Sequence, residues 1–140
     1  MAAISRSDLQ ALAVSRLDDA KLLLRRHRDA SAYYLAGYAV EFALKAAIAR
    51  RIERHVLPDP GFIREVYQHD LDRLIGLAEL RPELSNARRA NVRFNANWTV
   101  VSEWSVESRY QFIDRRRSVV MVKAVGESSG GVLPWLQKYW

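Results

Sequence analysis

The sequence predicts an all-α protein, an up-and-down four-helix bundle with short extra helices in which residues 1–140 form one domain. Apolar residues recur at spacings of three and four near the N-terminus, which is typical of an amphipathic helix. Residues 31–51 are almost entirely apolar over a length that suits a central helix. Only Trp98–Val101 has strand-like character, and no other segment could pair with it. With 49% hydrophobic residues, the 140-residue chain can bury one core but not comfortably two.

The first two helices are predicted to form an antiparallel hairpin. Ser5 or Ser7 can cap the first helix, with Asp8 in its first turn. The basic run 25–28 closes that helix on the favourable side of its dipole, and Asp29 caps the second helix, which runs to about Arg54. The apolar stripe of the first helix consists of Leu9, Leu12, Ala13, Leu17, Ala20, Leu23 and Leu24.

The rest of the chain breaks first at Pro58–Gly61. The predicted elements that follow are a short helix at 62–67, a third helix from His69 or Asp70 to Leu80, a short helix at 83–92, a packed loop at 95–106 anchored by Trp98 and Trp104, and a last long helix from Val106 or Ser108 that bends at Gly130, Gly131 and Pro134.

The second helix carries one polar face, because Tyr34, Tyr38, Glu41 and Lys45 follow steps of four, three and four. A membrane span is excluded because its longest apolar run, Ala32–Val40, is far shorter than the ~20 residues that a span requires. We expect Glu41 to be buried and ionised, with Arg109 as its main partner and Lys45 as a secondary one. If Arg109 lies elsewhere, the face becomes a candidate ligand site. Gly37, which is costly inside a helix, predicts that a neighbouring helix crosses closely there.

The run Ala30–Lys45 resembles the second helix of HEPN (higher eukaryotes and prokaryotes nucleotide-binding) domains. His69-Asp70-Leu71 is similar to the start of their third helix, and Trp104 with Arg109 and Tyr110 is similar to the entry to the fourth. The resemblance implies a helical bundle that is often a homodimer and is commonly paired with a minimal nucleotidyltransferase. Many members are metal-independent endoribonucleases or toxins of toxin–antitoxin pairs, and their mark is Arg-x4-6-His.

Two matches to that spacing occur, from Arg50 to His55 and from Arg64 to His69, and chance gives about as many. No histidine follows residue 69, whereas the ribonuclease members carry the motif near the start of the last helix. The leading expectation is therefore a catalytically degenerate module that binds nucleotide or RNA. The alternative is a ribonuclease in which His69 is the general base and Arg64 stabilises the phosphorane. A third is a purely structural dimer. The alternative for His69 is a purely structural role, in which its ring caps the third helix or packs against nearby residues.

The net charge of +6 is carried mainly by arginine, which suits phosphate contact and a nucleic-acid surface. The alternative is that GC-rich genomes favour arginine and that helix C-termini, where the first two arginine clusters of the sequence fall, favour cations. Arg115, Arg116 and Arg117 cannot all face inward on a helix, so at least one must project to solvent, where it can contact phosphate, RNA or an acidic partner. Most of the four tryptophans and six tyrosines are expected to be packing anchors rather than stacking platforms for single-stranded nucleic acid.

The chain has no cysteine, so disulfides and thiolate metal sites are excluded, and no metal or cofactor is expected. Its N-terminus lacks the apolar segment of a signal peptide, which favours a cytoplasmic location.

Overall fold

The computed structural model describes residues 3–140, which form helices and contain no strand. The predicted all-α helical bundle is therefore confirmed. The elements are α1 (Arg6–Arg25), α2 (Asp29–Arg51), α3 (Pro60–Val66), α4 (Leu71–Leu77), α5 (Arg81–Ala90), α6 (Val92–Ser102), the 3-10 helix η1 (Val106–Tyr110), α7 (Arg115–Gly126) and α8 (Val132–Leu136).

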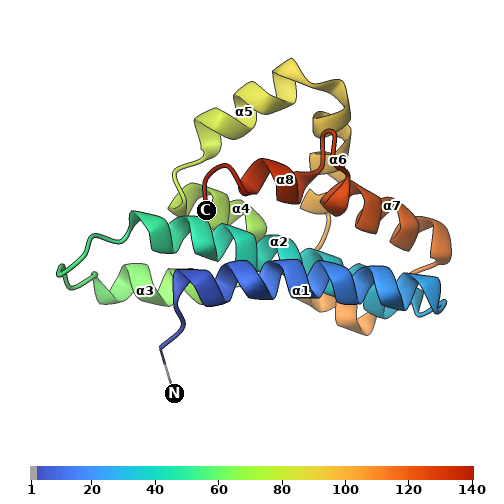
Figure 1. Ribbon diagram of the computed structural model, residues 1–140, viewed down its shortest axis with the longest axis horizontal. Coiled ribbons are helices and arrows are strands. Elements are labelled where there is room, and N and C mark those ends of the chain that lie inside the picture. The colour runs from blue at the N-terminus through green and yellow to red at the C-terminus, as the bar shows by residue number, and fades with distance from the viewer. Residues whose placement is uncertain (1–2) are drawn as a thin grey trace.

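Helices α1 and α2 form the predicted antiparallel hairpin and run side by side along the molecule (Figure 1). Ser5 caps α1, and the Asp8 side chain reciprocates to the Ser5 N–H, an arrangement worth about 1 kcal/mol. The tight turn between the helices places His27 at φ 57°. The prediction that Asp29 caps α2 was wrong. Arg28 is the N-cap residue without a side-chain bond, and Asp29 is the first helical residue, whose carboxylate binds another helix instead.

Helix α2 lies at the centre of the core, as its apolar composition predicts. It packs against α1, α4, α7 and α8. Its buried positions include many alanines, whose small side chains allow neighbouring helices to approach closely on several sides. Of the helices within residues 3–140, none has the length and apolarity to cross a membrane.

The second half of the chain differs from the prediction at residues 95–106. This segment is not a loop, because Val92–Ser102 forms α6 with Asn91 as its N-cap. Phe94, Trp98 and Val101 are buried at helical spacings of four and three. The Trp and Val residues suggested a strand, but this burial pattern outweighs their intrinsic preference. Trp98 and Trp104 are nevertheless buried anchors, as predicted.

The last helix also begins later than predicted. Val106–Tyr110 is a separate 3-10 helix, and α7 starts at Arg115, where the Asp114 carboxylate accepts the Arg117 N–H. The chain then breaks after Gly126 and resumes as the short helix α8. The remaining helix boundaries lie one to three residues from the predicted ones. Arg81 and Pro82, which were expected to separate two helices, form the first turn of α5, where proline is favoured.

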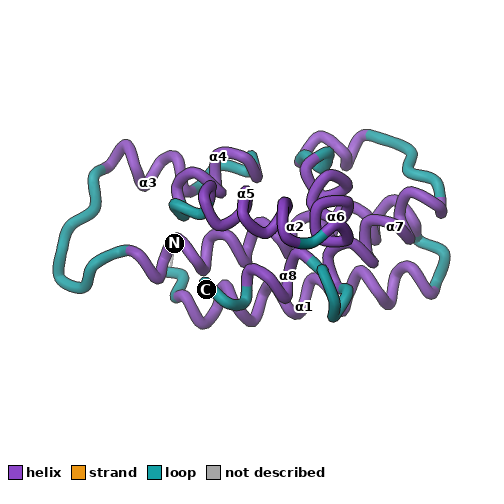
Figure 2. Tube along the Cα trace, turned by 90° about the horizontal axis from the view of Figure 1, so that it is seen from above, coloured by secondary structure: helices purple, strands orange, loops and turns teal. Residues whose placement is uncertain are grey.

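Viewed from above, α3 and α4 lie on one flank of the hairpin, with a long loop between α2 and α3 (Figure 2), whereas α5 stands above α8 in Figure 1. The first turn of α7 lies at the end of the molecule where α1 and α2 meet (Figure 1). Two regions of interest follow from this arrangement. One surrounds Glu41 midway along α2, and the other lies at the α1–α2 turn.

Candidate functional site

Glu41 is buried on α2, with 1% of its surface exposed, and its carboxylate is bound by the side chains of Lys45 and His69. The Lys45 ammonium lies 3.1 Å from Glu41 Oε2, and His69 Nδ1 lies 2.9 Å from Oε1. The predicted burial of Glu41 and the role of Lys45 are confirmed. Each carboxylate oxygen has its own partner, which offsets the large cost of removing the carboxylate from water.

The predicted pairing of Glu41 with Arg109 was wrong. Within residues 3–140 the ion pairs of Glu41 are those with Lys45 and His69. Arg109 belongs to η1, is exposed, and lies over the Tyr110 ring with Cζ 4.8 Å from the centroid. Tyr110 and then Tyr34 raise the pKa of Arg109 above its ordinary value. Tyr34 precedes Glu41 by two turns of α2, so Arg109 interacts with the part of the polar face that lies before Glu41.

His69 reaches α2 and does not cap or pack locally. The neighbouring Asp70 takes the capping role, because its carboxylate accepts the N–H groups of Asp72 and Arg73. A carboxylate oxygen can only accept, so in the neutral imidazole Nδ1 of His69 donates to Glu41 and Nε2 is left as the basic nitrogen. The ring is 45% exposed. It is therefore an oriented imidazole that solvent can reach.

Tyr34 and Tyr38 continue the polar face of α2 toward its N-terminus. The Tyr34 hydroxyl donates to that of Tyr38 at 3.3 Å. Burial, followed by the contact with Tyr34, raises the pKa of Tyr38. The rings of Tyr38 and His69 meet edge to face with centroids 6.0 Å apart, so the imidazole is held from two sides.

The close approach at Gly37 comes from a side chain and not from a crossing helix. A Cβ at this position would lie 2.1 Å from the Trp104 indole, so only glycine fits. The Trp104 ring also packs edge to face on Tyr38, with centroids 5.4 Å apart. Trp104 therefore fixes the segment after α6 against the middle of α2.

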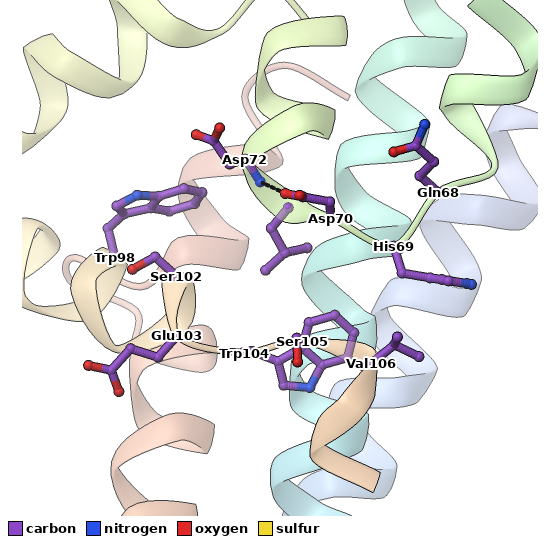
Figure 3. Close-up of a pocket in the computed structure, with 11 residues that line it drawn as sticks. Gln68, His69, Asp70, Asp72, Trp98, Ser102, Glu103, Trp104, Ser105 and Val106 are labelled. Carbon is purple, nitrogen blue, oxygen red and sulfur yellow. Dashed lines mark hydrogen bonds between the residues drawn. The ribbon is translucent and has the colours of Figure 1, made fainter. Parts of the chain in front are cut away.

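A cleft of about 600 Å³ lies beside His69, between the start of α4 and the end of α6 (Figure 3). Trp98 and Trp104 form part of its wall, and the carboxylates that line it are Asp70, which caps α4, Asp72, which is paired with Arg81, and Glu103. No arginine or lysine is among the residues that line it. The lining therefore offers no arginine or lysine that could hold a phosphate-rich ligand.

The second predicted catalytic residue, Arg64, is an exposed residue of α3. Within residues 3–140, no hydrogen bond or ion pair joins it to His69. The structure brings His69 together with Glu41 and Lys45, and the spacing from Arg64 to His69 does not correspond to a direct contact.

The three arginines at the start of α7 have different roles. Arg115 donates to the Leu24 carbonyl and to Asp29, both at 2.9 Å, and so ties α7 to the α1–α2 turn. Arg117 lies over the Tyr33 ring at 4.9 Å. Arg116 is exposed, and no protein acceptor or carboxylate partner is found for it within residues 3–140. This agrees with the expectation that at least one of the three projects to solvent.

The contacts of Arg115 bring two arginine clusters to one end of the molecule, which we call the basic end (Figure 1). It consists of the exposed residues Arg25, Arg26, Arg28, Arg115, Arg116 and Arg117. Two carboxylates are bonded to this end: Asp29 binds Arg115, and Asp114 caps α7. The six positive and two negative side chains give this end a formal charge of about +4.

Two exposed aromatic residues precede the basic end, and the sequence did not reveal them. Tyr110 is 73% exposed and Phe112 is fully exposed, whereas Ile113 between Phe112 and Asp114 is buried and anchors the segment. The expectation that most tryptophans and tyrosines are packing anchors does not hold for Tyr110, and it did not cover Phe112. The only available signal was the dense charge around them in residues 107–117.

No three side chains of His, Asp or Glu within residues 3–140 lie close enough together to hold a metal ion. No protein-family model, curated protein or solved structure matches the chain.

Proposed function

We propose that this protein is an RNA-binding module of the HEPN type, without catalytic activity, that contacts RNA through the basic end and the neighbouring aromatic segment. The observation that carries the proposal is the convergence of six exposed arginines with the exposed rings of Tyr110 and Phe112. Guanidinium groups contact phosphates, and exposed rings stack on unpaired bases. The cleft beside His69 is lined by no arginine or lysine and is not part of this surface.

The aromatic contribution can be tested by measuring single-stranded RNA affinity with fluorescence anisotropy. Replacing Phe112 with Ala is expected to weaken binding by about 1–3 kcal/mol, the usual value for one stacked base. Leu57→Ala is a matched control, because Leu57 is 95% exposed on the loop before α3. Equal affinities of wild-type and Phe112→Ala would show that the ring does not stack on RNA.

Because the sequence resembles HEPN domains, we also propose that the protein forms a homodimer and acts together with a small nucleotidyltransferase-like protein. Light scattering of the purified chain tests the dimer. The presence of a nucleotidyltransferase gene next to this one, followed by co-purification of the two products, tests the partner.

A ribonuclease is the second candidate, and the Glu41–His69 hydrogen bond favours it. A carboxylate that orients an imidazole and leaves Nε2 basic is the arrangement that a general base needs. In this candidate Arg64 would stabilise charge on the phosphate. Purified protein would then cleave single-stranded RNA in the presence of a chelator, and His69→Ala would abolish the cleavage. His55→Ala is the matched control, because His55 follows Arg50 at the same spacing. The binding proposal predicts no cleavage by any of these proteins.

A further inference from the structure

A second basic site lies at the opposite end of α2 from the α1–α2 turn. A cavity of about 560 Å³ is formed there by the last turn of α2, the segment between α4 and α5, and the chain after α8. Arg50 and Arg51 come from α2, while Lys138 and Tyr139 come from the chain beyond α8. Figure 1 shows the C-terminus over this part of α2 and beside α4. Segments far apart in the sequence therefore build one cavity.

The charges around this cavity are positive. Three of its lining residues are cations, and none is an aspartate or glutamate. Arg51 pairs with Glu79 at the rim. Arg50 and Lys138 are exposed, and among residues 3–140 neither has a carboxylate within 4.0 Å. These two cations are free to contact an anion that enters the cavity.

The remaining lining residues are apolar or aromatic. Ala47, Ala78 and Leu80 are buried and form an apolar floor. Tyr139 is held in place, because its ring packs on Trp135 with centroids 5.3 Å apart. Cations at the rim above an apolar floor suit a ligand with an anionic head and a small organic body, and the volume lies within the range of small-molecule sites.

We propose that this cavity binds a small organic phosphate, whose phosphate group contacts Arg50 and Lys138 and whose organic part lies on the apolar floor beside Tyr139. Arg51 remains paired with Glu79 and contributes positive potential. The competing explanation is that these cations only neutralise the negative end of α2 and the other helix ends nearby. That explanation requires no ligand, and the two make opposite predictions for binding.

The test measures the binding of phenyl phosphate to the protein by isothermal titration calorimetry. We expect binding to the wild-type chain, about tenfold weaker binding for Arg50→Ala and for Lys138→Ala, and weaker binding of inorganic phosphate, which lacks the organic part. Arg73→Ala is the matched control, because Arg73 is exposed on α4, does not line the cavity and does not belong to the basic end, and this variant is expected to bind as the wild-type does. Circular dichroism checks that each variant is folded, and Arg50→Lys should restore part of the affinity.

Three results would overturn the proposal. One is the absence of phenyl phosphate binding to the wild-type chain at millimolar concentration. The second is an equal loss in Arg73→Ala, which would show that the loss is not specific to this cavity. The third is equal binding of benzyl alcohol, which would show that the phosphate makes no contact. RNA binding at the basic end does not depend on this cavity, so each proposal can fail without the other.

Discussion

His69 Nδ1 lies 2.9 Å from Oε1 of Glu41, so a half-exposed imidazole at the start of α4 is joined to a carboxylate buried in the middle of α2. The other carboxylate oxygen is held by Lys45, whose side chain is only 11% exposed. This cluster links the central helix to the segment that leads into α4. Its stability can therefore be measured by removing one member at a time.

Glu41→Ala is expected to destabilise the protein by about 3–5 kcal/mol, because it leaves Lys45 mostly buried without a counter-charge. His69→Ala should cost less, and the double variant should lose less than the sum of the two, since the residues are in contact. Urea unfolding measures each free energy. Arg109→Ala is the control and should stay within about 0.5 kcal/mol, because this side chain is exposed and does not pair with Glu41. An Arg109→Ala loss as large as that of Glu41→Ala would restore the pairing expected from the sequence.

Gly37→Ala is expected to destabilise the protein by about 1–3 kcal/mol, although alanine usually stabilises a helix interior relative to glycine. The reason is the Trp104 indole, 2.1 Å from the position of an added Cβ. Gly76→Ala is the control within α4, where the nearest atom is the flexible end of Arg81 at 3.1 Å. Thermal unfolding compares the two. If Gly37→Ala raised the melting temperature, the indole would not lie against α2.

Tyr38 is expected to remain protonated at pH values where an ordinary tyrosine ionises, near pH 10. Burial raises its pKa, and the neighbouring Tyr34 hydroxyl raises it further. The pKa of Tyr38 is higher in the folded than in the unfolded protein. The contribution of protonated Tyr38 to the free energy of unfolding is therefore fully present below about pH 10 and is lost as the pH rises further. In an absorbance titration, folded wild-type and Tyr38→Phe should therefore coincide up to about pH 11. In concentrated denaturant, the absorbance change of the two proteins should differ by the ionisation of one tyrosine. The same difference in the folded proteins below about pH 11 would contradict the raised pKa of Tyr38.

Arg115 and Arg116 are neighbours in the sequence with different expected effects on stability. Arg115→Ala removes the bonds to Leu24 and Asp29 that hold α7 on the α1–α2 turn, and we expect a loss of about 1 kcal/mol for this partly exposed pair. Arg116→Ala should remain within about 0.5 kcal/mol of wild-type. Chemical unfolding of both variants tests the difference. Equal losses would mean that the contacts of Arg115 contribute nothing.

The hairpin of α1 and α2 could be predicted because its signals are local. Apolar periodicity and the Ser5 cap define α1, and the composition of residues 31–51 indicates a helix covered on most sides. The start of the last helix could not be located in the same way. Ser105 and Asp114 can each precede a helix, and the choice depends on the burial of Trp104, Ser108 and Ile113.

The site was predictable only in part for a similar reason. Burial of Glu41 follows from its apolar neighbours on α2, but its partners depend on which later segment packs at that level of the helix. His69 was found from a motif spacing, and its contact with Glu41 joins residues 28 positions apart. The exposure of Phe112 opposes its hydrophobic character, so no rule based on composition could have predicted it.

The salt dependence of RNA binding shows whether the basic end contacts the phosphates of the RNA. Affinity for a single-stranded RNA is measured at several salt concentrations for three proteins: the wild-type chain, the variant with Arg26, Arg28 and Arg116 replaced by Ala, and a control with the exposed Arg6, Arg73 and Arg89 replaced by Ala. Each phosphate contact contributes about 0.7 to the slope of logarithmic affinity against logarithmic salt concentration. We predict that the basic-end variant has a slope flatter by about 2 and that the control keeps the wild-type slope. Equal slopes for the two variants would contradict the assignment of the basic end as the RNA-binding surface.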